Sequence, residues 1–250
     1  MKRRVLHVIY SLYRGGAERL IESQAAASVG GYAYSVCALA GGGDLADSLR
    51  SMGVPVTLLC KRRPGDPGAL GALASLVRRE RPDLLHLHNA PGVLWGAAAA
   101  AAAGSRAPAV ATMHNPWREG LPAAYRLLFP IGLRRAARVV CVSEDVRRSF
   151  ARRFPRRADR LVTIPNGVDL DRFASPPPRE ECRRRFRLPA DVPVVGTVGR
   201  LVPVKNHLGL VEAFAALHET HPAAHLAILG DGEMRRAIEN LSLIHISEPT

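Results

Sequence analysis

The sequence has 250 residues and a mass of 27.0 kDa, enough to bury one large hydrophobic core or two modest ones, which excludes a small disulfide-stapled domain. Hydrophobic residues make up 47% and charged residues 23% of the chain, so it is too apolar to be disordered as a whole. The 35 Lys and Arg residues outnumber the 22 Asp and Glu residues, which gives a net charge of +13.

The positive charge is regional and consists mostly of arginine. Between Arg134 and Arg187 there are 16 arginines against 7 acidic residues, a balance of +9. Such a stretch favours anionic partners such as lipid headgroups, nucleic acid or a nucleotide. A bias toward Ala and Arg in the coding sequence, with solvated arginines, explains it equally well.

The cysteines lack the spacing of metal or redox motifs. They lie far apart, with no Cys-x-x-Cys, at Cys37, Cys60, Cys141 and Cys182. Three of them fall in apolar, strand-like runs, so we expect buried thiols in a reducing compartment.

Two apolar segments imitate targeting or membrane signals. The run that follows Met1-Lys2-Arg3-Arg4 resembles a signal peptide, but it has no small-residue cleavage site, so we expect mature structure there. The second run, Val93 to Gly104, is much shorter than the roughly 20 residues that a membrane-spanning helix needs. No transmembrane segment is expected.

Short apolar runs alternate with helical stretches over the first part of the chain, which favours βα units around a parallel sheet that is buried on both faces. The predicted strands are Val5–Tyr10, Tyr34–Leu39, Val56–Cys60, Leu84–His88, Ala109–Met113, Val139–Val142 and Leu161–Ile164. The predicted helices are Ala17–Val29, Asp44–Met52, Ala69–Glu80, Val93–Ala103, Ala123–Ala137 and Glu144–Arg153. Ser143 is expected to cap the last of these helices.

A proline-rich connector follows and leads to a second βα region. The residues Ala174-Ser175-Pro176-Pro177-Pro178 cannot continue a helix or a strand ladder. After them we predict helices at Arg179–Arg187, His207–His218 and Gly232–Glu239, and strands at Val194–Val198 and Leu226–Leu229. Two strands form only half of a Rossmann-like domain, so the second domain is expected to be incomplete.

The last ten residues differ in composition from what precedes them. The segment from Leu241 to Thr250 contains no arginine and no alanine, and it resembles the translated read-through of a sequencing adapter. We therefore expect a non-native tail. The alternative is a genuine β-strand followed by a Ser-Glu-Pro turn.

Two glycine-containing turns are candidates for binding an anion. Gly15-Gly16 lies between a predicted strand and a helix, where backbone N–H groups can face a ligand, although a tight turn alone explains both glycines. After the strand that ends at Val198, the loop carries Arg200 and Lys205 at the carboxyl end of the strand, and a diphosphate suits these two cations. Taken alone, they are more simply explained as surface Arg and Lys residues that flank a loop.

Three weaker features occur at other strand ends. Leu229-Gly230-Asp231-Gly232-Glu233 predicts a second glycine-rich βα loop, and Ile164-Pro165-Asn166-Gly167-Val168-Asp169 predicts a turn. His86, His88 and His114 close two strands where ligand-facing loops begin, and of these we single out His114. A histidine at a strand end is more often packed or solvated than catalytic.

In this order and at these distances, the motifs resemble glycosyltransferase family 4, a large retaining family with the two-domain GT-B fold. The resemblance is carried by Gly15-Gly16-Ala17-Glu18, His114-Asn115, Val142-Ser143-Glu144, Ile164-Pro165-Asn166-Gly167-Val168-Asp169, Val198-Gly199-Arg200-Leu201 with Lys205-Asn206, and Leu229-Gly230-Asp231-Gly232. It covers residues 5 to about 240. It implies an α/β protein with two Rossmann-like domains and parallel sheets.

The resemblance also implies a reaction and a set of site residues. A sugar would be transferred from a nucleotide-diphosphate donor to an acceptor, with retention at the anomeric carbon and with no required metal or other cofactor. Arg200 and Lys205 would bind the diphosphate and stabilise the leaving charge, and Gly16 would approach it from the other domain. His114, the candidate catalytic residue, would orient the donor sugar. On the acceptor side the candidates are Gly15 and Asn89.

The domain organisation implied in this way has four parts. Residues 1–173 form an N-terminal Rossmann-like, acceptor-side domain, 174–192 a linker with a connecting helix, 193–240 a truncated C-terminal nucleotide-sugar domain, and 241–250 the non-native tail. The family pattern continues to a glutamate-rich motif that this chain does not reach. We therefore expect negligible transferase activity from these 250 residues.

The expected partners are a nucleotide sugar and a glycan or lipid-linked acceptor. The arginine-rich helices suggest a cytoplasmic protein in peripheral contact with the anionic inner face of a membrane. A sugar-phosphate or sucrose-type synthase is a neighbouring alternative in the same superfamily. The alternative from another class, a basic nucleic-acid-binding protein, is disfavoured because only 5% of the residues are aromatic and no recognition motif occurs.

Overall fold

The computed structural model describes residues 2–13, 15–27, 31–61, 63, 65–117 and 123–245. The chain divides into two compact units, unit 1 (residues 1–168) and unit 2 (residues 169–250). This division lies five residues before the end of the first predicted domain, inside the loop that follows its last strand.

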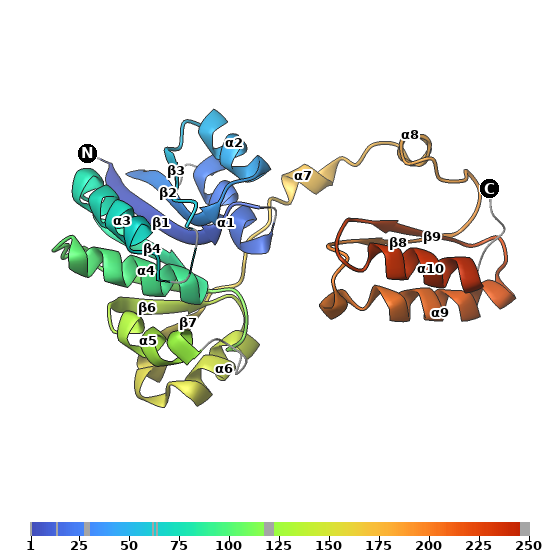
Figure 1. Cartoon of the computed structure of the whole chain (residues 1–250). Helices are drawn as coiled ribbons and strands as arrows, with labels where there is room; N and C mark the ends of the chain where they lie inside the picture. Colours follow the sequence, from blue (N-terminus) through green and yellow to red (C-terminus); the bar gives the residue numbers. More distant parts are fainter. Residues whose placement is uncertain are drawn as a thin grey trace. The chain divides into compact units, whose positions relative to one another are not determined.

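Unit 1 contains a parallel sheet with the strand order β3-β2-β1-β4-β5-β6-β7 (Figure 1). The strands are β1 (Arg3–Ser11), β2 (Tyr32–Gly41), β3 (Val56–Leu58), β4 (Leu84–His88), β5 (Ala109–Met113), β6 (Ala136–Cys141) and β7 (Leu161–Thr163). The chain runs outward from β1 to β3 and then returns to place β4 on the other side of β1. Ligands of open parallel sheets bind at such a reversal, beyond the carboxyl ends of the strands.

Helices cover both faces of this sheet. They are α1 (Gly16–Ala26), α2 (Asp44–Ser51), α3 (Pro67–Glu80), α4 (Asn89–Ala102), α5 (Ala123–Leu133) and α6 (Glu144–Arg153), followed by the 3₁₀ turn η2 (Pro155–Arg160). Alternate residues of one strand enter different cores, as the period of a strand requires: Leu6 and Val8 join the larger core with α3 and α4, whereas Ile9 joins the smaller core with α1 and α2. This double burial explains the continuous apolar runs of the strands.

The predicted α/β class is confirmed, and all seven strands and six helices of unit 1 are present; β4, β5 and α6 have the predicted bounds, and the bounds of the others are shifted. Helix α4 begins at Asn89 rather than Val93, because Pro91 falls in the first turn, where its missing N–H costs no helical hydrogen bond. The expected helix Ala123–Ala137 was too long, since β6 already begins at Ala136.

The expectation for the cysteines is only partly correct. Cys37 and Cys141 are buried, but Cys60 is exposed and Cys182 is half-buried. Strand β3 ends at Leu58, so Cys60 lies in the loop that follows, with a φ of 49°, instead of in the buried strand that was predicted.

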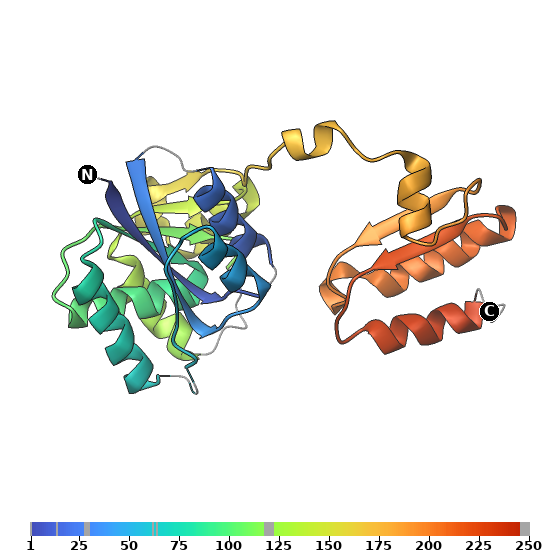
Figure 2. The same ribbon diagram turned by 90° about the horizontal axis from the view of Figure 1, so that it is seen from above.

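Unit 2 is built around a parallel pair of strands (Figure 2). Its elements are α7 (Asp171–Ala174), α8 (Arg179–Arg185), β8 (Val194–Val198), the 3₁₀ turn η3 (Pro203–Lys205), α9 (His207–Thr220), β9 (His225–Leu229) and α10 (Arg235–His245). Its core is small: Leu201, Val211 and Ile238 are buried, and partly buried side chains of β9 and α10 pack around them.

The end of the chain is helical as far as it is described. Residues 241–245 continue α10, so the alternative of a β-strand is wrong for them, and residues 246–250 lie outside the described residues. The origin of this tail in an adapter stays a prediction. No helix in the described ranges is both long and apolar enough to span a membrane.

Candidate functional site

The glycine turn after β1 opens helix α1 at the carboxyl edge of the sheet. Gly15 is the N-cap residue with a φ of −161°, an extended conformation that any residue can adopt, and Gly16 is the first helical residue. A Cβ at Gly16 would have no atom within 4 Å, apart from its own helix and chain neighbours. Packing within unit 1 therefore does not require a glycine at position 16.

The ends of β4 and β5 are joined through Asn89. Its side-chain oxygen Oδ1 accepts a hydrogen bond at 3.0 Å from the backbone N–H of His114, and its own backbone has a φ of 56°. Asn and Asp tolerate this left-handed region better than most residues. The structure thus places two of the predicted site residues, Asn89 and His114, in direct contact.

Four histidines lie together on β1, β4 and the end of β5. His7 is opposite His86 in the register of β1 and β4, and its Nδ1 atom lies 3.0 Å from Nε2 of His88. In turn, Nδ1 of His88 lies 3.2 Å from Nε2 of His114. The rings of His86 and His88 stack with their centroids 4.3 Å apart. The three predicted histidines therefore share one cluster.

Burial keeps these imidazoles neutral. The side chains of His7 and His88 are almost completely buried, and desolvation lowers their pKa well below the ordinary value. Desolvation also lowers the pKa of His86 and of His114 to about 4. In neutral form each ring donates one hydrogen bond and accepts another, so the cluster orients groups and does not supply positive charge.

His86 lies inside β4, not at its end as the sequence interpretation assumed, and it has a separate partner. Its Nε2 atom is 2.7 Å from Oγ1 of Thr112 on β5. His7, His86 and His88 bring one ligand atom each to within 4.8 Å of one another, so these neutral imidazoles are the described residues that could hold a metal ion.

The sequence interpretation missed His7. It stands alone in the apolar run of β1, and only the pairing of β1 with β4 brings it beside the His86-x-His88 pair. The available signal was a polar residue inside a strand that is otherwise buried, since buried polar side chains need partners.

In unit 2, the two cations that were predicted to bind phosphate lie in the loop between β8 and α9. Arg200 follows the strand directly, and Lys205 ends the turn η3. Both side chains are exposed, and among the described residues neither has an acidic partner at ion-pair distance. A hydrogen bond to a buried side chain fixes the start of this loop: Nε2 of His207 lies 3.2 Å from the carbonyl oxygen of Arg200.

The loops after β8 and β9 lie side by side. The Gly199 N–H donates to the Leu229 carbonyl at 3.0 Å, and the Leu201 N–H donates to the Asp231 carbonyl at 2.9 Å. Gly230 has a φ of 159°, and a Cβ there would overlap the carbonyl oxygen of Gly199. Here, in contrast to Gly16, the close approach of two backbones explains the glycine.

The contacts of the Val142-Ser143-Glu144 motif are structural. The hydroxyl of Ser143 accepts from the Val146 N–H at 3.2 Å, which confirms the predicted cap of α6. Glu144 is bound by Arg147 and accepts a hydrogen bond at 3.0 Å from Thr163, and these contacts lower the pKa of its carboxyl to about 2. Glu144 thus ties α6 to β7.

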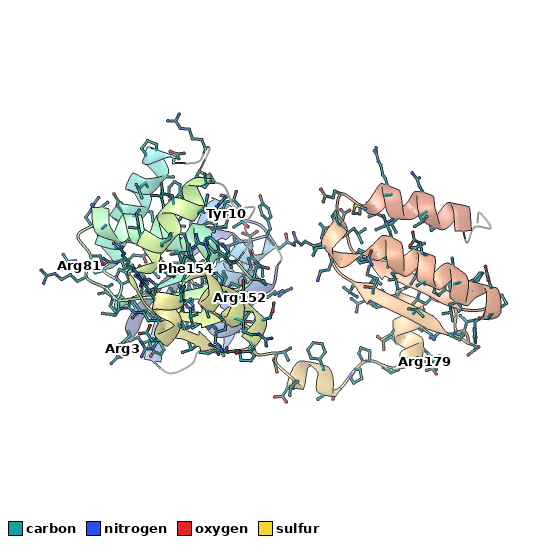
Figure 3. The ribbon with its side chains drawn as sticks, turned by 90° about the horizontal axis from the view of Figure 1, so that it is seen from below. Arg3, Tyr10, Arg81, Arg152, Phe154 and Arg179 are labelled. Carbon is teal, nitrogen blue, oxygen red and sulfur yellow. The ribbon has the colours of Figure 1, made fainter. Side chains whose placement is uncertain are left out.

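Several arginines of the basic stretch hold backbone carbonyls. Arg160 donates to the Ala136 carbonyl at 3.2 Å, Arg157 to that of Leu133, and Arg135 to that of Ser105. Other arginines point outward: Figure 3 shows Arg81 projecting from the periphery of unit 1. Phe154, labelled in the same view, is buried. Part of the charge that suggested an anionic partner is therefore used in holding the fold together.

An open apolar groove of about 690 Å³ lies between α3, α4 and α5. Its lining includes Leu94, Trp95 and Leu128, together with Arg134 and Arg135. Helix α5 can pack close to α4 at Gly132, where a Cβ would lie 3.2 Å from the carbonyl oxygen of Val93. The sequence interpretation did not predict this groove.

Comparison with protein families decides the relationship. Residues 14–172 match the family described as Glycosyltransferase Family 4, and residues 178–246 match Glycosyl transferases group 1. The chain belongs to glycosyltransferase family 4. The resemblance noted on the motifs of the sequence is thereby confirmed.

Curated relatives of this family 4 chain come from bacteria. It is 29% identical over 201 residues to the UDP-Gal:alpha-D-GlcNAc-diphosphoundecaprenol alpha-1,3-galactosyltransferase of Escherichia coli, covering 76% of this chain and 51% of the relative. It is 36% identical over 154 residues to the GDP-mannose-dependent alpha-(1-6)-phosphatidylinositol monomannoside mannosyltransferase of Mycolicibacterium smegmatis, covering 61% and 40%. The chain spans about half the length of the curated relatives it matches.

Solved structures share the fold. The Anabaena HepE protein in complex with UDP-glucose aligns with a TM-score of 0.81 at 22% identity, covering 97% of this chain and 66% of that one. A sucrose-phosphate synthase from Thermosynechococcus elongatus aligns with a TM-score of 0.71 at 18% identity, covering 98% and 68%. These similarities confirm the predicted GT-B architecture of two Rossmann-like units.

Proposed function

We propose that this chain belongs to an enzyme that transfers a sugar from a nucleotide-diphosphate donor to a glycan or lipid-linked acceptor, with retention at the anomeric carbon. The relatives named above use UDP-galactose and GDP-mannose, and HepE binds UDP-glucose, as their names and title state. The observation that carries the proposal is the exposed pair Arg200 and Lys205, which has no acidic partner in the described ranges and follows the carboxyl end of β8.

Arg200 and Lys205 suit a diphosphate for physical reasons. A guanidinium can donate two parallel hydrogen bonds to phosphate oxygens, and an ammonium adds a compact charge. Both cations stand where the N-terminus of α9 opens, and the dipole of a helix favours an anion at that end. As the bond to the sugar breaks, negative charge grows on the departing diphosphate, and fixed cations stabilise that charge more than the ground state.

The residues of unit 1 have neutral roles in this proposal. His114 would orient the donor sugar through hydrogen bonds, because its imidazole is uncharged, and Gly16 would let a phosphate approach the backbone N–H groups of α1. Gly15 and Asn89 are the acceptor-side candidates. The two cations of unit 2 supply positive charge at the leaving group, so the proposed reaction requires no metal or other cofactor.

Calorimetric titration tests the role of the diphosphate. We expect UDP or GDP to bind at least tenfold more tightly than UMP or GMP, since each charge-assisted hydrogen bond contributes about 1.5–3 kcal/mol. A panel of UDP- and GDP-sugars then identifies the donor. Equal affinity for the monophosphate and the diphosphate would contradict the proposal.

The acceptor is a separate question, for which a sugar phosphate is the second candidate. It is favoured only by the likeness to the sucrose-phosphate synthase, which at 18% identity shows a shared fold. Because little turnover is expected from these 250 residues, the assay uses the whole enzyme to which the chain is proposed to belong: product analysis with the identified donor, a hexose phosphate and a polyprenyl-linked sugar distinguishes the two acceptor classes. Transfer to the hexose phosphate alone would exclude the lipid-linked acceptor.

We also propose that unit 1 contacts an anionic membrane surface through α5. Leu127, Leu128 and Ile131 are large apolar side chains that are 73%, 48% and 58% exposed on this helix. The exposed Arg126 and Arg134 flank them, so apolar and basic groups lie together as interfacial binding requires. A lipid-linked acceptor would be presented at such a surface.

Co-sedimentation with vesicles tests this contact. Vesicles containing phosphatidylglycerol should bind the chain, phosphatidylcholine vesicles should bind it much less, and added salt should weaken the binding. The double variant Leu127→Ser/Ile131→Ser should lose most of the binding. Leu217→Ser, at a partly exposed leucine on α9 of unit 2, is the matched control. Salt-independent binding, or equal loss in the control, would rule out the α5 surface.

A further inference from the structure

The histidine cluster of unit 1 contains an unbroken chain of imidazoles that runs from His7 through His88 to His114. We propose that His7 and His88 are positioning residues that set the tautomer of His114, so that its Nδ1–H is presented as a fixed hydrogen-bond donor to a sugar oxygen. The destination of this N–H rests on the proposed function. The existence of the chain of imidazoles does not depend on that function, because it follows from the geometry of β1, β4 and β5 alone.

Proton counting restricts the chain to two arrangements. A neutral imidazole has one N–H and one bare nitrogen. His88 uses both of its nitrogens, because Nε2 faces Nδ1 of His7 at 3.0 Å and Nδ1 faces Nε2 of His114 at 3.2 Å. Each contact needs one donor and one acceptor. If His88 carries Nδ1–H, the other two must also carry Nδ1–H, and if it carries Nε2–H, so must they.

The two ends of the chain decide between these arrangements. Nε2 of His7 and Nδ1 of His114 are buried atoms that have no hydrogen-bond partner within the described part of the protein. With Nε2–H on every ring, an unpaired N–H lies on His7, which is only 1% exposed in the core. With Nδ1–H on every ring, the core holds only a bare nitrogen and the N–H stands on His114, which is partly exposed at the carboxyl edge.

Buried N–H groups without an acceptor are rarer in proteins than unpaired acceptors. Nδ1 of His114 is itself buried in this structure, but it belongs to a partly exposed ring at the carboxyl edge of the sheet, so under the proposed function it is the end of the chain of imidazoles at which a donor sugar would supply the missing acceptor. The arrangement with Nδ1–H on all three rings is therefore the favoured one. Burial supports it, because a low pKa keeps the rings neutral and preserves the alternation of donor and acceptor. His86 stands outside the chain, since Nε2 of His86 faces Thr112.

Long-range ¹H–¹⁵N correlation spectra of the ¹⁵N-labelled protein read the tautomer of each ring directly, because protonated and bare ring nitrogens have very different shifts. At pH 7 we expect His7, His88 and His114 all to carry Nδ1–H. Different tautomers on these three rings, or Nε2–H on all of them, would overturn the proposal. This measurement needs no sugar donor, no sugar acceptor and no enzymatic turnover.

Substitutions at the core end then test transmission to His114. His7→Leu removes the donor to His88, and we expect the ring of His114 to change to a mixture of both tautomers. In His7→Asn, the amide nitrogen can occupy the place of Nδ1 and donate to His88, so the single tautomer should be retained. Thr112→Val is the matched control, because it removes the partner of His86 without touching the chain. An unchanged His114 in His7→Leu, with the fold intact, would contradict the proposal.

Adding Zn²⁺ and then a nucleotide sugar to the labelled protein separates this inference from its alternatives. If Zn²⁺ binds stoichiometrically and shifts the ring nitrogens of His7, His86 and His88, the cluster is a metal site and the relay is wrong. The donor sugar is added last. If the tautomers are as expected but no nucleotide sugar changes the His114 shifts, the relay stands and the proposed function fails at this residue. If the sugar binds, His7→Leu should weaken it about threefold to tenfold, as the loss of one oriented hydrogen bond does.

Discussion

The two units carry polar groups of opposite character at the carboxyl ends of their strands. In unit 1 the histidines lie on β1, β4 and the end of β5, where burial keeps them neutral, so they can offer oriented hydrogen bonds but no positive charge. In unit 2, Arg200 and Lys205 are exposed and charged, on a loop that His207 holds from below. Under the proposed function, this difference would suit the two parts of a nucleotide sugar, because hydroxyl groups need oriented partners and phosphates need charge.

The glycines at the two loops also differ, in how much space surrounds them. Gly16 has open space around its missing side chain, whereas Gly230 is pressed against the backbone of Gly199. The first therefore leaves room for a ligand to approach, and the second is needed for the fold. Substitutions that separate binding from stability can test this contrast.

The largest expected effect concerns the cations of unit 2. The double variant Arg200→Ala/Lys205→Ala should lose about 3–6 kcal/mol of binding free energy for UDP or GDP, two to four powers of ten in Kd, because it removes two charge-assisted contacts. Arg235→Ala is the control, since Arg235 already pairs with Glu239 at 2.9 Å on the same helix. Calorimetry measures the affinity of both variants for the nucleotide. An equal loss of affinity in Arg235→Ala would show that overall positive charge, and not a specific site, binds the nucleotide.

The next effect is the loss of stability of unit 1 in acid. His86 and His114 stay neutral in the folded unit down to a pKa of about 4, whereas the unfolded chain takes up protons near 6.5. Unfolding thus binds protons between these values, and stability should fall as the pH falls from about 6.5 to 4, by up to about 1.4 kcal/mol per pH unit for each such ring.

Tryptophan fluorescence during urea unfolding measures this loss for unit 1 alone, because both tryptophans of the chain, Trp95 and Trp117, lie in it. His86→Gln should reduce the slope of stability against pH. His221→Gln in unit 2 should leave it unchanged. A stability of unit 1 that does not vary between pH 7 and pH 4.5 would show that the buried rings are not neutral as inferred.

A smaller effect separates the two glycines. Gly230→Ala should destabilise unit 2 by about 1–3 kcal/mol, because its φ of 159° and the Gly199 carbonyl exclude a side chain. Hydrogen exchange of the β8 and β9 amides would report it. Gly16→Ala should leave exchange unchanged and weaken nucleotide binding severalfold. A stability loss in Gly16→Ala as large as that in Gly230→Ala would remove the distinction.

The smallest effect tests the cap of α6. Ser143→Ala removes the acceptor of the Val146 N–H and should lower the free energy of unfolding of unit 1 by about 1 kcal/mol. Ser143→Thr, which keeps a hydroxyl, should retain most of it. Tryptophan fluorescence again reports the change, and a loss in the Thr variant equal to that in the Ala variant would show that the hydroxyl does not act as a cap.

Much of the fold followed from local pattern. The runs at residues 84–88, 109–113 and 194–198 became β4, β5 and β8 with the predicted bounds, because short, mostly apolar runs between turn residues are typical of strands. Errors occurred where local signals compete. Helix α4 was predicted to begin at Val93 but begins at Asn89, because Pro91 is tolerated in the first turn of a helix.

The candidate site was predictable only in part. Arg200 and Lys205 are close in sequence, on one loop after one strand, so their joint placement followed from spacing. The contact between Asn89 and His114 was not predictable, because it depends on β4 and β5 lying side by side. His7 was missed for the same reason.

The sequence by itself determined the alternation of strands and helices, the class of the protein, the family motifs and the loop that carries the two cations. These are properties of neighbouring residues, whose spacing and polarity fix what they can form. Only the tertiary structure decided which distant side chains meet: the chain of imidazoles across β1, β4 and β5, and the packing of Gly230 on Gly199. Such contacts depend on strand order and register, which are set by how the whole sheet buries its surface.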